Sequence, residues 1–122
     1  MSQPLTTKNK WEDIWANVRI PQIAKPCPDL RRQLKRFLPK GGGKFLCEVG
    51  CAPGKWMAWF AKNYGYEVEG IEYAENAAEI TKRNLELQQV PGKVLIKDFF
   101  AADITQHCYD IIFSSGFIEH FD

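Results

Sequence analysis

A glutamate followed by a glycine-rich turn is the part of this sequence whose residue types and spacing best suit ligand binding. Glu48 lies in a short apolar run, residues 45–49, which has the length of a buried parallel strand and is too short for a helix. The turn that follows reads Gly50-Cys51-Ala52-Pro53-Gly54. Glycines let a backbone approach a ligand closely, and a carboxylate binds an ammonium group. The stretch therefore predicts a ligand site at the end of a strand.

A helix is predicted directly after this turn. Its aromatic residues recur at intervals of three or four, at Trp56, Trp59, Phe60 and Tyr64. This spacing is typical of one apolar face of a helix. A strand, a glycine turn and a helix in this order form the first half of a nucleotide-binding βαβ unit, where the helix N-terminus offers free N–H groups.

The run Glu48-x-Gly50-x-Ala52-x-Gly54 resembles motif I of class I S-adenosylmethionine-dependent methyltransferases, usually (Asp/Glu)-x-Gly-x-Gly-x-Gly. Ala52 stands where the middle glycine usually lies. The resemblance implies that Glu48, Gly50, Cys51, Ala52 and Gly54 bind the cofactor. A dinucleotide site has the spacing G-x-G-x-x-G and holds a pyrophosphate, so the spacing disfavours an NAD-dependent oxidoreductase.

The next strands carry further candidate cofactor residues. Residues 67–72 are predicted as the second strand, and Glu72 lies 22 residues beyond Gly50. An acid about 20 residues after the glycine motif hydrogen-bonds ribose hydroxyls in nucleotide-binding folds. Tyr73 beside it can pack on an adenine ring.

A helix is predicted over residues 74–88 and a third strand over 93–98. Asp98 and Phe99, at the end of that strand, resemble the adenine-reading acid of the methyltransferases and its neighbour.

A fourth strand is predicted over residues 109–116, and the segment from Ser114 to Phe121 reads Ser-x-Gly-x-Ile-Glu-His-Phe. It resembles the fourth motif of small-molecule methyltransferases of the ubiquinone/menaquinone-biosynthesis type. The resemblance implies cofactor contacts from Ser114, Ser115 and Gly116, and an acceptor pocket faced by Glu119 and His120. His120 is either a general base or a packing residue at a helix start, and the sequence leaves both open.

The N-terminal region predicts two helices joined by a proline-rich connector. The first has one apolar face, with Trp11, Ile14, Trp15 and Val18. Its tryptophans pack in the core or, as the resemblance implies, form a lid over the cofactor.

The second helix is predicted from Asp29, as its N-cap, to Leu38. Its apolar face carries Leu30, Leu34, Phe37 and Leu38, and its other face carries Arg31, Arg32, Lys35 and Arg36, followed by Lys40 and Lys44. The basic face is either solvated or binds an anion.

The bulk composition indicates one globular domain of 122 residues with a formal net charge of +1, which gives no global argument for a nucleic-acid partner. No stretch has the length of a membrane span, and the given N-terminus lacks the apolar core expected of a signal peptide. The four cysteines lack the spacing of a zinc site and predict reduced thiols in a cytoplasmic protein, with no metal.

The resemblance implies an α/β fold, a Rossmann-like parallel sheet with flanking helices. The family has seven strands in the order 3-2-1-4-5-7-6, and this chain is expected to supply a truncated sheet of four, 3-2-1-4. We expect an N-terminal helical lid over residues 1–40 and a cofactor-binding half-domain over 41–122. Ile111, Ile112 and Phe113 predict an apolar edge in the fourth strand, covered in a homodimer or by a missing C-terminal half.

The predicted function is methyl transfer from S-adenosylmethionine to a small-molecule acceptor, with S-adenosylhomocysteine as the product. One alternative is an FtsJ-like ribose methyltransferase of RNA, because the turn at residues 50–56 is similar to that family's G-A-A-P-G-G-W. That family has a catalytic aspartate where this chain has Ser114 and Ser115. The other alternative is a non-catalytic cofactor-binding or assembly module.

Overall fold

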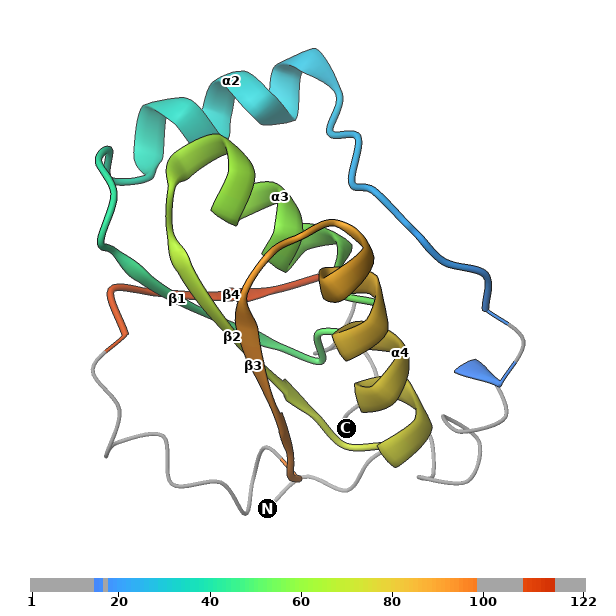
Figure 1. Cartoon of the computed structure of the whole chain (residues 1–122). Coiled ribbons are helices and arrows are strands. Elements are labelled where there is room, and N and C mark those ends of the chain that lie inside the picture. The colour runs from blue at the N-terminus through green and yellow to red at the C-terminus, as the bar shows by residue number, and fades with distance from the viewer. Residues whose placement is uncertain (1–14, 17, 99–108, 116–122) are drawn as a thin grey trace, which may run out of the picture.

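The computed structural model describes residues 15–16, 18–98 and 109–115 (Figure 1). Its strands form one parallel four-stranded sheet in the order β3-β2-β1-β4. The strands are β1 (Phe45–Val49), β2 (Glu67–Glu72), β3 (Gly92–Ile96) and β4 (Ile111–Ser114). The predicted strand order and the Rossmann-like architecture are therefore confirmed.

The register of the sheet brings the carboxyl ends of all four strands to one edge. Val49 of β1 pairs with Ile71 of β2 on one side and with Ser114 of β4 on the other. Glu72 pairs with Ile96 of β3. Parallel α/β sheets bind their ligands at this edge, so the candidate site residues at these strand ends lie together.

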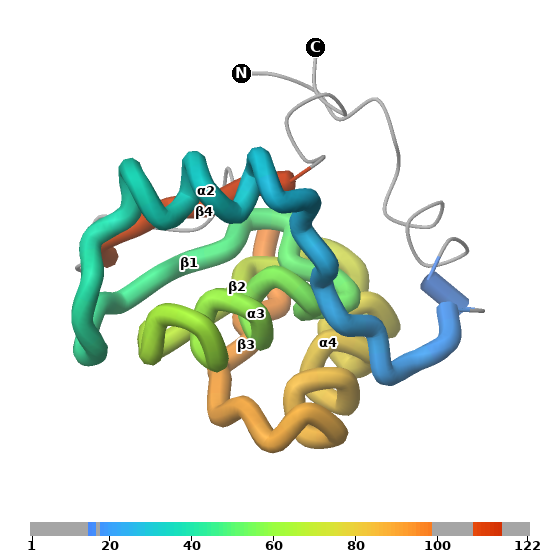
Figure 2. The backbone as a smooth tube through the Cα atoms, turned by 90° about the horizontal axis from the view of Figure 1, so that it is seen from above, coloured from blue at the N-terminus to red at the C-terminus, as the bar shows by residue number. Residues whose placement is uncertain are grey.

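Three helices are described: α2 (Pro28–Phe37), α3 (Lys55–Tyr64) and α4 (Glu75–Leu87). α3 packs on β1 and β2, α4 packs on β2 and β3, and α2 lies beside α3 (Figures 1 and 2). Gly65 ends α3 in the left-handed conformation, with φ +69°, and its N–H donates to the Ala61 carbonyl at 3.0 Å. The bounds of α4 agree with the predicted helix over residues 74–88 within one residue, and α3 contains all the aromatic positions from which a helix was predicted.

The core lies between the sheet and the two helices α3 and α4. Leu46 of β1, Val68 of β2 and Val94 of β3 pack there with Met57 and Phe60 of α3. Successive side chains of a strand point to opposite faces, so only part of each strand faces these two helices.

Six aromatic side chains join this core to β4 and to the start of β2. We call them the aromatic cluster: Trp56, Trp59, Phe60, Tyr64, Tyr66 and Phe113. The Phe60 and Phe113 ring centroids are 5.0 Å apart, and those of Tyr64 and Tyr66 are 5.2 Å apart. The aromatic spacing along residues 56–64 therefore does mark the inner face of a helix, as predicted.

The start of α2 differs from the prediction. Cys27, not Asp29, is the N-cap residue, and Pro28 is the first helical residue. Proline suits that position because its φ is already helical and it has no N–H to leave unpaired. Asp29 lies in the first turn instead, where its negative charge interacts favourably with the positive end of the helix dipole.

Only part of the predicted apolar face of α2 packs against the rest of the protein. Leu34 and Leu38 pack against the core, but no residue of α2 is buried and Phe37 is 73% exposed. The Arg36 guanidinium lies 5.2 Å from the centre of the Phe37 ring, which gives that ring a cation–π partner at the surface.

Two strands, β3 and β4, are also shorter than predicted. β3 ends at Ile96, so Asp98 lies two residues beyond it, and β4 begins at Ile111. Of the three apolar residues expected at the edge of β4, Phe113 packs on Trp56 and Phe60, whereas Ile112 is 57% exposed.

Several predicted site residues lie outside the described residues: Trp11, Phe99, Gly116, Glu119 and His120. Within the described ranges, no helix combines the length and the hydrophobicity that crossing a membrane requires.

Candidate functional site

The turn between β1 and α3 needs glycine at both ends. Gly50 has φ +68°, and its N–H donates to the Ile71 carbonyl of β2 at 2.9 Å. Gly54 has φ +87°, and a Cβ there would lie 2.8 Å from Thr81 Cγ2. Positive φ and this close approach both exclude a side chain. The turn is therefore held tightly between the end of β2 and α4.

Glu72 fixes the middle of the same turn. Its Oε2 accepts a hydrogen bond from the Ala52 N–H at 3.0 Å, and its Oε1 accepts one from the Tyr73 N–H at 3.1 Å. The Ala74 N–H also contributes, and since a carboxylate has about four acceptor positions, capacity remains for a ligand. Glu72 thus links the glycine turn to the end of β2 and still has acceptor positions for hydroxyl groups.

Glu48 supplies a buried carboxylate beside this turn. Its side chain is 3% exposed, and its Oε1 has no hydrogen-bond partner among the described residues. The Oγ of Ser114, at the end of the neighbouring β4, is also buried there, and no described residue is its hydrogen-bond partner. Buried polar atoms are nearly always hydrogen-bonded, so two such atoms at adjacent strand ends indicate a place where a ligand supplies the partners.

Two buried carboxyl groups lie close together at this site, so a bound cation would stabilise their charged forms. Burial raises the pKa of the Glu48 carboxyl well above its ordinary value, and the charge of Glu72 raises it further. Lys55 and the Met57 backbone N–H oppose this rise without cancelling it. Burial also raises the pKa of Glu72, against hydrogen bonds from the Ala52, Tyr73 and Ala74 N–H groups.

A ligand with both an ammonium group and a vicinal diol would match these two acids. The ammonium would give the unpaired Oε1 of Glu48 a charged donor and lower the cost of burying that carboxylate. Hydroxyl groups would donate to the remaining acceptor positions of Glu72.

Gly70, in the middle of β2, is a residue that the sequence analysis missed. A Cβ at Gly70 would lie 2.5 Å from the Cys51 Sγ and 2.8 Å from the Met57 Sδ. The missing side chain lets the turn and the first turn of α3 sit directly on the sheet. A glycine inside a strand pattern often marks such a close approach, so the signal was present in the sequence.

Asn84 of α4 is a second residue that was missed. It is fully buried, and its Nδ2 donates to the Pro53 carbonyl of the turn at 2.8 Å and to the Gln22 carbonyl at 3.0 Å. Its Oδ1 accepts from the Gln22 N–H at 2.9 Å. Asn84 therefore ties the glycine turn to the chain before α2, and no sequence pattern pointed to this contact.

The other predicted residues lie at different distances from this centre. Cys51 is buried with its thiol against Gly70, so its contribution to a ligand is limited to its backbone. Tyr73 and Trp15 are half-buried, whereas Asp98 and Ser115 are exposed. The structure thus brings together the turn, Glu48, Glu72, Tyr73 and Ser114 at one edge.

The sequence matches the methyltransferase domain family over residues 46–122, so the chain belongs to that family. Its fold is that of the class I S-adenosylmethionine-dependent methyltransferases. No curated protein matches the sequence well enough to count as a relative.

Three solved structures illustrate the likeness of fold. A methyltransferase from Thiobacillus denitrificans, in complex with S-adenosyl-L-homocysteine, has a TM-score of 0.64 at 20% identity and covers 87% of this chain. A putative methyltransferase from Methanococcus maripaludis scores 0.66 at 18% identity and covers 75%. An RNA methyltransferase from Salinibacter ruber, also with S-adenosyl-L-homocysteine, scores 0.62 at 20% identity and covers 75%.

The match covers 42% of each of the first two proteins and 60% of the third. The chain therefore corresponds to part of each of these structures.

Proposed function

We propose that this chain binds S-adenosylmethionine at the carboxyl edge of its sheet and serves methyl transfer to a small-molecule acceptor. The observation that carries the proposal is the unpaired, buried Oε1 of Glu48 beside the Gly50–Gly54 turn. The methionine part of the cofactor has an ammonium group, which is the donor that this oxygen lacks. The S-adenosyl-L-homocysteine bound in the Thiobacillus and Salinibacter structures supports the choice of ligand.

The roles of the described residues follow from their positions. Glu48 would hold the ammonium, and Glu72 would accept hydrogen bonds from the ribose hydroxyls while it keeps the turn in place. Tyr73 and Asp98 would bind the adenine. The backbone of the turn would lie against the middle of the ligand, and Ser114 Oγ would donate to it from β4.

When bound, S-adenosylmethionine supplies a methyl group already activated by its sulfonium, so the protein mainly contributes alignment and a water-poor site. Glu119 and His120 remain the predicted acceptor-side residues. His120 would be either the base that takes the proton of the acceptor or a packing residue at a helix start. Both lie outside the described residues, as do the predicted ligand contacts of Trp11, Phe99 and Gly116.

A small-molecule acceptor is the preferred class. The geranyl diphosphate C-methyltransferase from Streptomyces coelicolor, which shares the fold at a TM-score of 0.52 and 18% identity, gives an example of such an acceptor. The FtsJ-like alternative lacks its acid at the end of β4, where the chain has Ser114. A non-catalytic module would bind the cofactor and transfer no methyl group to any of a panel of acceptors.

Calorimetric titration with S-adenosylhomocysteine tests the cofactor site. We expect the wild-type chain to bind, and Glu48→Gln and Glu72→Ala each to weaken binding by about tenfold or more, since each removes a charge-assisted contact. Glu67→Gln is the matched control. It removes an acid from the exposed start of the same β2 strand and should leave the affinity unchanged.

Circular dichroism should first show that each variant is folded. A folded wild-type chain that does not bind S-adenosylhomocysteine would refute the proposed site. Equal loss in Glu67→Gln would show a general charge effect and would refute the assigned roles of the two buried acids.

We also propose that the edge of β4 is covered, by a second copy of the chain or by further strands. The 57% exposure of Ile112 on this edge supports a partner. Sedimentation of the wild type and of Ile112→Lys tests the dimer, which the charge should dissociate. A wild-type monomer would exclude the second copy.

A further inference from the structure

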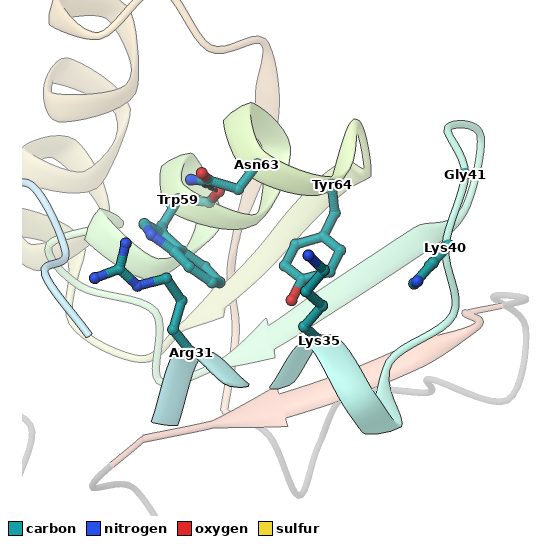
Figure 3. Close-up of a pocket in the computed structure, with 7 residues that line it drawn as sticks. All are labelled: Arg31, Lys35, Lys40, Gly41, Trp59, Asn63 and Tyr64. Atoms are coloured by element: carbon teal, nitrogen blue, oxygen red, sulfur yellow. Dashed lines mark hydrogen bonds between the residues drawn. The ribbon is translucent and has the colours of Figure 1, made fainter. Parts of the chain in front are cut away.

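A cavity lies between α2 and α3, away from the glycine turn, with a volume of about 360 Å³ (Figure 3). Figure 3 shows Arg31 and Lys35 of α2 facing Trp59 and Tyr64 of α3, with Lys40 on the loop beside them. The volume lies in the range of small-molecule sites.

This cavity and the proposed cofactor site lie toward opposite ends of α3. The cofactor site adjoins Gly54, where α3 begins, and the cavity adjoins Asn63 and Tyr64, where α3 ends. The ten residues of the helix span about 15 Å. The two sites are therefore distinct.

The three cations of the cavity have no acid partner in the described part of the chain. The ion pairs among the described residues are Arg32–Asp29 and Lys82–Glu79, and neither pair includes a residue that lines the cavity. Arg36, on the other face of α2, has the Phe37 ring beneath it. Of the cations on α2, Arg32 and Arg36 have partners within the protein, whereas the cavity-facing Arg31 and Lys35 are available for a ligand anion.

The opposite wall is aromatic. Tyr64 stacks with Tyr66 on one side at a centroid distance of 5.2 Å, which fixes its ring. Trp59 meets the Tyr64 ring edge-on at 5.6 Å and is only partly buried. A cationic wall facing an aromatic wall is the combination that binds a phosphate together with a planar base.

We propose that this cavity binds a nucleoside phosphate, with the phosphate on Arg31, Lys35 and Lys40 and the base against Trp59. Arg31 and Lys35 lie one helical turn apart and act on the same phosphate. The ligand is a free nucleotide or one unit of a single-stranded RNA, because both present this chemistry.

Calorimetric titration with uridine 5′-monophosphate tests the proposal, since uracil avoids any adenine site near Glu72. Uridine and ribose 5-phosphate are the partial ligands. We expect each to bind at least about tenfold more weakly than the complete nucleotide, because each lacks either the phosphate or the base.

The double variant Arg31→Gln/Lys35→Gln should lose about tenfold or more in affinity for the nucleotide, because two charge-assisted contacts are removed. The matched control is Arg32→Gln/Arg36→Gln, which removes the same charge from the same helix outside the cavity. It should stay within about twofold of the wild type at 0.15 M salt, where distant charges are screened. Trp59→Phe should weaken the nucleotide and leave ribose 5-phosphate unchanged.

A ten-residue oligouridylate separates the two sources. Affinity more than about tenfold above that of the mononucleotide, with a steep salt dependence, assigns the cavity to single-stranded RNA. Equal affinity per nucleotide assigns it to a free nucleotide.

Three outcomes would overturn the proposal. One is the absence of mononucleotide binding at about 10 mM by the folded wild-type chain, a concentration that detects even weak complexes. Another is an equal loss in the two double variants. The third is ribose 5-phosphate binding as tightly as the nucleotide.

Discussion

The two ends of α3 carry opposite kinds of site. At its start, Glu48 and Glu72 are 3% and 6% exposed and lie beside the glycine turn, which Glu72 helps to hold in place. At its end, Arg31 and Lys35 are exposed cations beside a partly open aromatic wall. The first end concentrates unpaired negative charge in a low dielectric, and the second spreads positive charge into water.

The difference between the two ends shows which binding groups destabilise the folded protein when no ligand is bound. A buried carboxylate without a partner destabilises the empty protein, and a bound cation removes that cost. An exposed cation has almost no such cost, because water solvates it in the empty state. Substitutions at the cofactor end should therefore change stability and binding together, whereas those at the cavity end should change binding alone.

The largest expected effect is on Gly70→Ala. The added Cβ would meet the Cys51 Sγ at 2.5 Å, so the turn must move away from the sheet, at a cost of about 2 kcal/mol or more in the free energy of unfolding. Urea unfolding measures this. Gly42→Ala is the control, because its Cβ would lie 3.6 Å from the Gly65 carbonyl oxygen, an ordinary contact. Equal stability of the two variants would contradict the tight packing of the turn on β2.

Asn84→Ala should follow, with a loss of about 2 kcal/mol, because it leaves the Pro53 and Gln22 backbone groups without their buried partner. The matched control is Asn63→Ala at the other end of the comparison. Asn63 is exposed and makes one hydrogen bond, from its Nδ2 to the Trp59 carbonyl. Thermal unfolding should show a clear loss of stability in Asn84→Ala and little change in Asn63→Ala. A similar loss in both variants would contradict the role of Asn84 in holding the turn.

Glu48→Gln should stabilise the empty chain while it weakens cofactor binding. The folded pKa of Glu48 lies above its ordinary value of 4.5, so the unfolded chain releases this proton first and the wild type loses stability as the pH rises above about 4.5. At pH 8 the variant should be more stable than the wild type, because glutamine cannot ionise in this buried position.

Urea unfolding between pH 4 and pH 8 checks this sign. The loss with rising pH should be smaller in Glu48→Gln than in the wild type and should not vanish, because the raised pKa of Glu72 contributes in the same direction. A variant less stable than the wild type at pH 8 would show that Glu48 has a stabilising partner in the empty protein.

The smallest expected effect is on the cavity end. Arg31→Gln/Lys35→Gln should change the free energy of unfolding by no more than about 0.5 kcal/mol, because both side chains are exposed and unpaired within the described residues. Chemical unfolding measures it beside Glu48→Gln. A destabilisation as large as that of Asn84→Ala would erase the contrast between the two ends.

Much of the fold was predictable because its signals are local. The apolar run at residues 45–49, the glycine turn and the aromatic spacing of α3 each follow from the chain within one element. The start of α2 was predicted wrongly because Asp29 and Pro28 compete for the helix start, and the fixed φ of proline prevails. The exposure of Phe37 could not be predicted, since apolar spacing does not say how far a partner surface extends.

The sequence by itself determined the strands, the acid at the end of β1 and the acid at the end of β2, because strand periodicity and glycine spacing are short-range. The strand order was expected only from the resemblance to the methyltransferases, and the tertiary structure shows it. Only the tertiary structure decided that Glu72 holds the Ala52 N–H, and that Asn84 joins the turn to Gln22. Only it placed the basic side of α2 opposite Trp59. These contacts join residues 20 to 62 positions apart, and packing of whole elements, not local preference, sets which of them meet.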